Sequence, residues 1–234
     1  MNWQDEGYLL SKIKFRENAS IINVFTNTYG KVSGIVYGGN SRKIRNFLQI
    51  SNKIFVFHYS KSQNKIGYFK TELIEAISPR YFNDKKKTSA LLSLSSILNL
   101  LLPESQPYKN LFFSLDNLFK NFNKDNWVFY YIYWELSLLK ELGFDPYLDQ
   151  FKNINSEISN LKTIRIDNVK YQVPIFLIKK NNLKILDNKT ISAALSFTRN
   201  ILTNKFFSPN NLLFPKSRIL LENYFNWFTT SNAK

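Results

Sequence analysis

The sequence predicts an α+β protein in which a small five-stranded β-barrel is followed by a mainly α-helical domain with one small hairpin. Three observations lead to this fold class. Hydrophobic residues alternate with a period of two over about the first eighty residues, and the period becomes helical beyond a proline and a run of lysines at 79–87. A short alternating stretch then returns near residue 165.

Five stretches of alternating β-branched and aromatic residues, separated by Gly, Asn and Ser turns, predict the strands of the barrel. They cover Gly7–Phe15, Ile21–Thr26, Lys31–Tyr37, Lys53–Tyr59 and Ile66–Ile77. Strands of this length and spacing favour a closed barrel of the OB type, and an SH3-like barrel fits the spacing nearly as well. In the fourth strand we expect Phe55 and Phe57 to face the core.

Apolar residues at helical spacing predict five helices, over Thr88–Leu102, Tyr108–Phe122, Trp127–Leu142, Thr190–Asn204 and Lys216–Thr229. The third is apolar nearly all round, so we expect it to be the central buried helix. We expect Asp125 to cap its start and Gly143 to follow its end. A hairpin is predicted over Thr163–Val173. The sequence therefore predicts two domains, over residues 1–80 and 88–234.

The charge balance points to an anionic partner. The chain has 32 Lys and Arg against 17 Asp and Glu, a net charge of +15. An AT-rich genome explains abundant lysine and aromatic residues, but it does not explain the shortage of acidic ones. A pI near 9.8 is typical of nucleic-acid binders. An anionic membrane surface, an acidic protein partner, or no electrostatic partner remain open alternatives.

Several chemistries are excluded or disfavoured by residue types. The chain has no cysteine, which excludes disulfides, thiolate metal sites and thiol catalysis. Its one histidine, His58, cannot build a multi-histidine metal site, and we expect it to be structural. Adjacent carboxylates such as Asp5 and Glu6 rarely form a two-metal centre, and no phosphate-binding Gly-Lys loop is present. We therefore expect no catalytic residues, metal or cofactor, and no enzymatic activity.

The ends of the chain and its hydropathy suggest a location. The N-terminus is acidic and polar, unlike a signal peptide. The longest apolar stretch, near Trp127–Leu139, is interrupted by Glu135 and Ser137 and is too short to span a bilayer. We expect a cytoplasmic, nucleoid-associated protein.

Positive charge concentrates in the predicted barrel. Between residues 12 and 70 there are eleven Lys and Arg and one acidic residue, a local charge of +10. Contacts from such residues to phosphates dominate affinity for nucleic acids. The residues that we predict to contact nucleic acid are Lys12, Lys14, Arg16, Lys31, Arg42, Lys43, Arg45 and Lys65.

Two groups within this set have a specific spacing. Arg42, Lys43 and Arg45 follow Gly38 and Gly39, so we expect a basic loop after a tight turn. Its alternative is an ordinary solvated loop. Lys12, Lys14 and Arg16 are spaced by two, which places them on one face of a strand. The aromatic residues that could stack on bases, or else belong to the core, are Tyr29, Tyr37, Phe47 and Tyr68.

Two segments stand in order in the first half of the chain: the opening Trp3–Leu10 (WQDEGYLL) and the glycine-pair segment Tyr37–Arg45 (YGGNSRKIR), with Leu48, Gln49 and Asn52 after it. They resemble the first half of the RecO family of bacterial recombination proteins. The stretch Trp134–Phe144 (WELSLLKELGF) is similar to its central helix. Weaker matches lie in Phe207–Pro209 and Pro215–Arg218.

This resemblance implies an N-terminal OB-fold, a helical C-terminal domain and a recombination mediator. Such a protein binds single- and double-stranded DNA, anneals complementary strands and helps to load recombinase. The implied partners are the acidic tail of the single-stranded-DNA-binding protein, RecR and, indirectly, RecA. The tail would bind near the central helix, at Lys120, Lys124, Tyr130, Tyr131 and Lys140.

One departure from the family concerns zinc. Some members carry a four-cysteine zinc site, which this cysteine-free chain lacks, and we expect the hairpin Thr163–Val173 in its place. Three rival interpretations of the whole chain remain, of which a nuclease or other enzyme has the least support. A generic OB-fold module that binds RNA or the ribosome would share the charge, and a scaffold that docks a partner through its helices would owe its charge to codon bias.

Overall fold

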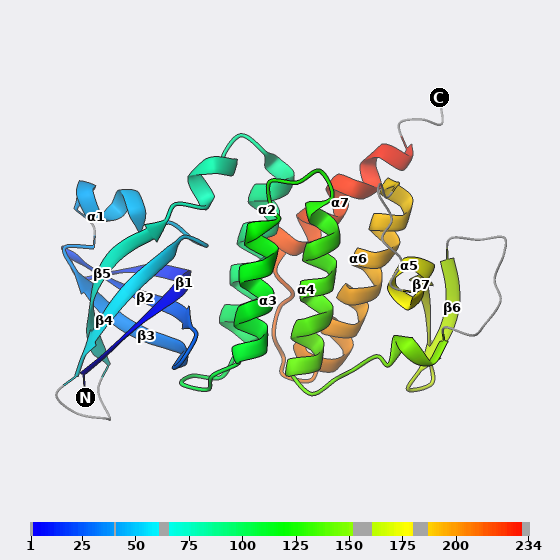
Figure 1. Cartoon of the computed structure of the whole chain (residues 1–234), viewed down its shortest axis with the longest axis horizontal. Helices are drawn as coiled ribbons and strands as arrows, with labels where there is room; N and C mark the ends of the chain where they lie inside the picture. The colour runs from blue at the N-terminus through cyan, green and yellow to red at the C-terminus, as the bar shows by residue number, and fades with distance from the viewer. Residues whose placement is uncertain (1, 40, 61–65, 152–160, 180–186, 231–234) are drawn as a thin grey trace. The chain divides into compact units, whose positions relative to one another are not determined.

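A computed structural model describes residues 2–39, 41–60, 66–151, 161–179 and 187–230, without the side chains of Lys43 and of residues 227–230. By their contacts, the residues form two compact units. One comprises Met1–Phe112 and Pro215–Arg218, and the other comprises Phe113–Phe214 and Ile219–Lys234. Figure 1 shows strands β1 to β5 in the first unit and the hairpin β6–β7 in the second.

The first unit contains a closed five-stranded barrel. Its strands are β1 (Asn2–Phe15), β2 (Ala19–Thr26), β3 (Gly30–Tyr37), β4 (Lys53–Tyr59) and β5 (Gly67–Glu75). Their order is β1-β2-β3-β5-β4, and β1 pairs with β4 to close the barrel. The β3–β5 pair is parallel, whereas the others are antiparallel. The predicted fold class, an OB-type barrel followed by helices, is confirmed.

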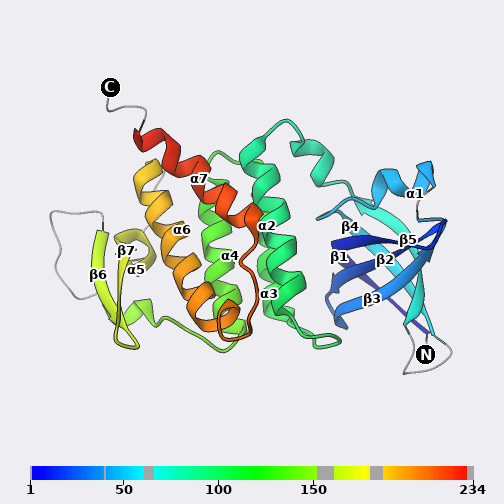
Figure 2. The same cartoon turned by 180° about the vertical axis from the view of Figure 1, so that it is seen from behind.

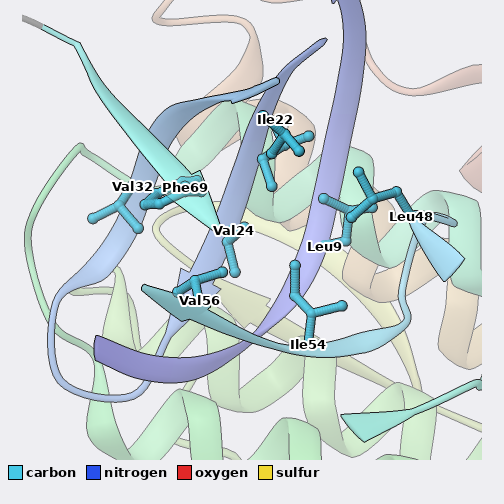
Figure 3. Close-up of a cluster of buried hydrophobic side chains, with 9 residues drawn as sticks. Leu9, Ile22, Val24, Val32, Leu48, Ile54, Val56 and Phe69 are labelled. Atoms are coloured by element: carbon cyan, nitrogen blue, oxygen red, sulfur yellow. The ribbon is translucent and has the colours of Figure 1, made fainter. Parts of the chain in front are cut away.

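The barrel core is aliphatic apart from one ring. Figure 3 shows its side chains gathered between the strands. The cluster consists of Leu9, Ile22, Val24, Val32, Val36, Leu48, Ile54, Val56 and Phe69. The prediction that Phe55 and Phe57 face this core is wrong. Ile54 and Val56 take the inward positions of β4, so strand alternation turns the two phenylalanines outward, where they are half-buried.

The glycine-pair segment ends in a helix rather than in the predicted basic loop. Helix α1 (Arg42–Phe47) begins after Ser41, whose side chain accepts a hydrogen bond from the amide of Ile44. Ile44 and Phe47 pack against the barrel cluster, and Leu48 belongs to it. Six residues with two apolar contacts are too short for a helical period to show in the sequence. The basic residues of α1 therefore sit on a structured element at one end of the barrel (Figure 1).

Helix α2 (Lys85–Leu101) packs on the barrel through β1 and follows the 3₁₀ turn Ser78–Tyr81. The hydroxyl of Ser51 lies 2.8 Å from that of Ser95 and donates to the carbonyl of Leu91. Asn23 donates through its side chain to that of Asn99 at 2.7 Å. These contacts place α2 in the same compact unit as the barrel.

The remaining helices are α3 (Lys109–Lys120), α4 (Trp127–Glu141), α5 (Ile175–Lys179), α6 (Asn188–Leu202) and α7 (Lys216–Thr230). Within the second unit α4 is largely buried, as predicted, and it contacts α6. Gly143 follows its end with φ +92°. The prediction that Asp125 caps α4 is wrong. Asn126 precedes the helix without a side-chain hydrogen bond, because backbone turns at 124–129 already occupy the first amides.

The predicted hairpin is present as β6 (Leu161–Ile166) and β7 (Val169–Pro174). It packs on α6 through β7, where the rings of Tyr171 and Phe197 meet edge to face. In Figure 2, α6 lies between α4 and this hairpin with α5. The short helix α5, the 3₁₀ turn Leu148–Phe151 and the π-turn Thr203–Phe207 were not predicted.

Candidate nucleic-acid interface

Four cations gather around the turn between β3 and α1. Lys12 and Lys14 lie on one face of β1, and Arg42 and Arg45 are one helical turn apart on α1. Lys14, Arg42 and Arg45 are exposed, and Lys12 is half-buried. The amine of Lys12 donates to the carbonyl of Gly39 at 2.8 Å, which ties β1 to the turn. We call Lys12, Lys14, Arg42 and Arg45 the basic rim.

The electrostatics of Lys12 reflect its crowded setting. Burial lowers its pKa from the ordinary value of 10.5, and the positive charge of Arg45 lowers it further. A neighbouring cation can act in this way only if it is close enough to repel the ammonium. The basic rim is therefore an arrangement that an anion would stabilise.

The two glycines of this turn are required by its backbone. Gly38 has φ +71°, in the left-handed region that favours glycine. A Cβ on Gly39 would lie 3.0 Å from the Ser20 hydroxyl and from the Val36 carbonyl. The amide of Ser41 donates to the carbonyl of Gly38 at 2.8 Å, so the turn leads directly into the cap of α1. The glycine pair thus serves to present α1 beside β1.

The other cations predicted to bind nucleic acid lie elsewhere. Strand β1 ends at Phe15, and Arg16 lies in the following turn with φ +54°, so the shared strand face does not extend to it. Lys31 is 8% exposed, and its amine donates to the Asn99 carbonyl at 2.9 Å, 3.7 Å from Glu104. Lys43 lies in α1, but its side chain is outside the described residues, as is all of Lys65.

Three of the four aromatic residues singled out by sequence are exposed. Tyr37 is 62%, Tyr68 39% and Tyr29 36% exposed. Phe47, the fourth, packs against the barrel cluster.

Sequence reasoning missed Trp3, which stacks on Tyr29 at 4.1 Å and on His58 at 4.7 Å between ring centroids. Trp3 was overlooked because it precedes the first predicted strand. Strand β1 in fact starts at Asn2, and the Trp3 backbone pairs with that of His58 in β4.

The residues expected to bind an acidic tail do not form a single group. Lys124 lies in the turn between α3 and α4, with its amine 5.7 Å from the centroid of the Tyr130 ring, and Lys120 is exposed at the end of α3. Tyr131 is fully buried. Lys140 is ten residues beyond Tyr130 on α4, about 15 Å along the helix, where it pairs with Asp145 at 3.6 Å. We call Lys120, Lys124 and Tyr130 the α3–α4 turn cluster.

Two further features of the described residues concern metal binding and membrane-spanning helices. Across the part of the chain that the structure describes, no group of three or more His, Asp or Glu side chains is placed to hold a metal ion. Among the same residues, no helix has the length and apolar character needed to cross a bilayer.

The closed barrel with its basic rim, followed by helices, defines an OB-type protein with a positively charged barrel. Comparison with known proteins makes this specific. Residues 1–77 match the family described as recombination protein O N terminal, and residues 83–160 match recombination protein O C terminal. The two matches follow one another and together cover more than half of the chain. The chain belongs to the RecO family.

Individual relatives support this assignment. The chain is 34% identical over 148 residues to the DNA repair protein RecO of Wolbachia sp. subsp. Drosophila simulans (strain wRi). It is 35% identical over 150 residues to that of Wolbachia pipientis subsp. Culex pipiens (strain wPip), and 30% identical over 145 residues to that of Roseobacter denitrificans (strain ATCC 33942 / OCh 114). Each alignment spans 62% of this chain and 60% of the relative.

Proposed function

We propose that this protein is a recombination mediator in DNA repair, which binds single- and double-stranded DNA and anneals complementary strands. Membership of the RecO family and the names of its relatives supply the context. The observation that carries the proposal is the basic rim on an OB-type barrel, where Lys12 and Arg45 are close enough to repel one another. Phosphates would relieve this repulsion, and cations released from DNA would favour binding.

The proposed mechanism is electrostatic and needs no covalent step. Complementary strands repel one another through their phosphates, and this repulsion opposes pairing. A cationic surface that binds two strands lowers the repulsion and raises the local concentration of each strand near the other. Lys14, Arg42 and Arg45, which are exposed, would provide the first contacts. We leave Lys31 out of this surface, because its amine is already bound to the Asn99 carbonyl and faces Glu104.

We further propose that the protein helps recombinase to replace the single-stranded-DNA-binding protein, through partners that its family suggests. These are the acidic tail of that protein, RecR and, indirectly, RecA. For the tail we favour the α3–α4 turn cluster, where the Lys124 amine and the Tyr130 ring lie together. An acidic peptide that ends in an aromatic residue needs such a combination of cations and apolar surface.

The test is annealing of complementary single strands, first bare and then coated with the cognate single-stranded-DNA-binding protein, at several salt concentrations. We expect acceleration that persists on coated strands and weakens as salt rises. The triple variant Lys14→Glu, Arg42→Glu, Arg45→Glu should lose annealing. Its duplex affinity should fall, and the slope of log affinity against log salt should decrease in magnitude by about 2 to 3, roughly 0.9 for each lost phosphate contact.

A second triple variant controls for net charge. Lys109→Glu, Lys170→Glu and Lys189→Glu alter exposed lysines outside the basic rim by the same total charge. If binding is local, this control retains most of the affinity at physiological salt, because a lysine that contacts no phosphate adds little attraction once salt screens its charge. Equal losses in both variants would remove the assignment to the basic rim, and a preference for structured RNA would favour a generic RNA-binding module instead.

A further inference from the structure

Aromatic side chains line the outer face of β4 and β5. The inward positions of these strands belong to Ile54, Val56 and Phe69, which point into the barrel core in Figure 3. Because successive side chains of a strand point to opposite faces, the residues between them face outward. These outward residues are Phe55, Phe57 and Tyr59 on β4, and Tyr68, Lys70 and Glu72 on β5.

The register of the two strands sets these residues side by side. The opposing pairs, in order, are Tyr59–Tyr68, Phe57–Lys70 and Phe55–Glu72. The face therefore has an aromatic and cationic end, with two tyrosines and a lysine, and an end that carries an exposed carboxylate. An anionic ligand would be attracted to the first end and repelled from the second.

Three tyrosines form a continuous row at the cationic end. The rings of Tyr59 and Tyr68 stack, with centroids 5.0 Å apart and planes inclined by 15°. The ring of Tyr37, at the end of β3, lies 6.2 Å from that of Tyr68. The Lys70 amine lies 5.6 Å from the Tyr59 centroid. We call Tyr37, Tyr68 and Tyr59 the tyrosine row.

The exposure of Tyr37 and Tyr68 shows that these two rings are not packing residues of the barrel, whereas Tyr59 is half-buried. Tyr37 is 62% and Tyr68 39% exposed, whereas the inward Phe69 between Tyr68 and Lys70 is 2% exposed. Large apolar surfaces that gather in the open commonly mark binding sites. Flat rings that are already stacked on one another offer a face to a further flat group.

The charges around the tyrosine row indicate which class of ligand it would bind. Tyr37 is followed by Gly38 and Gly39, and the Gly39 carbonyl accepts the hydrogen bond of Lys12. The row therefore leads into the basic rim. Aromatic faces beside cations are how proteins bind single-stranded nucleic acid: bases stack on the rings while phosphates meet the cations. A folded protein partner would not need cations at both Lys70 and the rim.

We propose that the tyrosine row is a stacking platform for the bases of single-stranded DNA, with the phosphates held by Lys70 and the basic rim. This inference rests on the proposed DNA binding and adds how single strands are told from duplexes. Bases in a duplex are already paired and stacked on one another, so they cannot use the rings. The row serves single strands alone, and the basic rim serves both forms.

The test compares ligands with equal charge and different bases, using the full-length chain. The probes are an oligo-dT strand, an abasic strand of the same length, and a duplex. We expect tighter binding of oligo-dT than of the abasic strand, on the order of tenfold to one hundredfold. The variant Tyr37→Ala, Tyr68→Ala should bind oligo-dT as weakly as the abasic strand, with its affinities for the abasic strand and the duplex unchanged.

Two further variants separate stacking from other effects. Tyr37→Phe with Tyr68→Phe keeps both ring faces and should keep the preference for oligo-dT. Tyr147→Ala removes a tyrosine that is 61% exposed and lies outside the row, and it should change nothing. Circular dichroism and thermal melting confirm that each variant is folded.

The outcomes distinguish the two proposals. If the wild-type chain binds oligo-dT and the abasic strand equally, or if the alanine variant keeps the preference, the stacking platform is overturned while DNA binding through the basic rim stands. If the wild-type chain binds none of the probes, the proposed DNA binding fails and the platform fails with it. Loss of the preference in the phenylalanine variant would also overturn stacking, since the ring faces remain.

Discussion

Lys12 holds its positive charge in a setting that disfavours it. Its side chain is half-buried, and Arg45 adds a like charge nearby. Burial, and after it the repulsion from Arg45, lower its pKa from 10.5. As pH rises, Lys12 will therefore lose its proton, and its attraction for phosphate, earlier than an exposed lysine.

This setting predicts how the pKa of Lys12 responds to its neighbours. The variant Arg45→Gln should raise that pKa toward 10.5 without reaching it, because burial is the larger cause and remains. NMR titration of the lysine side-chain signals measures the change, with Lys12→Arg to assign the resonance. Arg42→Gln is the matched control and should have a smaller effect. A lowered pKa in Arg45→Gln, or equal shifts in both variants, would contradict this account.

The burial and orientation of some side chains could not be predicted from the sequence. The excess of basic residues in the barrel was plain from composition, but composition could not show that Lys31 is buried against Asn99. That contact joins residues 68 positions apart. The same limit applies to Phe55 and Phe57: alternation separated them from Ile54 and Val56, but it could not say which set faces inward. Their aromatic character suggested the wrong one.

At the scale of elements, the first turn of helix α2 carries charges that are unfavourable at the start of a helix. Lys85, Lys86 and Lys87 occupy its first turn, where the helix dipole disfavours cations. Asp84 offsets this, since its carboxylate accepts a hydrogen bond from the Lys87 amide at 3.0 Å. Asp84 therefore stabilises the start of α2 both as its cap and as a compensating charge.

The cap of α2 yields a paired prediction. Asp84→Ala should lower the free energy of unfolding by about 1 kcal/mol, because it removes both a cap and a carboxylate beside three lysines. Asp125→Ala, at the start of α4, should change it by less than about 0.5 kcal/mol, because that aspartate is exposed and does not cap the helix. Urea denaturation measures both. A larger loss for Asp125 would show that α4 is capped after all.

The α3–α4 turn cluster makes a second prediction at this scale. Lys124→Glu or Tyr130→Ala should weaken binding of an acidic, aromatic-ended peptide by several-fold or more, because each removes one half of the Lys124–Tyr130 pair. Lys140→Glu is the control, since Lys140 lies at the other end of α4 and pairs with Asp145. Fluorescence anisotropy of a labelled peptide gives the affinities. Dependence on Lys140 instead would move the binding site along the helix.

Regular elements were predictable from the sequence, and short ones were not. Strand β4 has the predicted bounds, and α4 starts where its apolar residues start. Strand β1 begins five residues before its predicted start, because Gln4, Asp5 and Glu6 pair with β4 despite their polar side chains. Helices α1 and α5, of six and five residues, are too short to display a period and depend on packing.

At the scale of the whole molecule, the division of the chain is less simple than its sequence suggests. The proline and lysine run at 79–87 predicts a boundary between residues 80 and 88, and this remains a prediction. By contacts, however, α2 groups with the barrel, to which Ser95 and Asn99 are hydrogen-bonded. The order of barrel and helices followed from the hydrophobic period alone. That period carries no information about which distant segments contact one another.

This grouping predicts the behaviour of fragments. A fragment of residues 1–112 should unfold at higher urea concentration than a fragment of residues 1–80, because the shorter one loses the helix that packs on β1 and leaves Ser51 without its partner Ser95. Circular dichroism and tryptophan fluorescence follow the transition. Equal midpoints would indicate that the barrel is complete without α2 and that the boundary lies at residue 80.

The pairing of β1 with β4 also orders events during synthesis. Asn2 pairs with Tyr59, so the start of β1 waits for a partner that is made 57 positions later. Until then β1, β2 and β3 can form only an open three-stranded sheet, whose free β1 edge pairs readily with other chains. The edge of β1 is paired only when β4 has been made, and the parallel pair of β3 and β5 forms only when β5 has been made. We therefore expect the nascent chain to need protection from association until β5 (Gly67–Glu75) has been made.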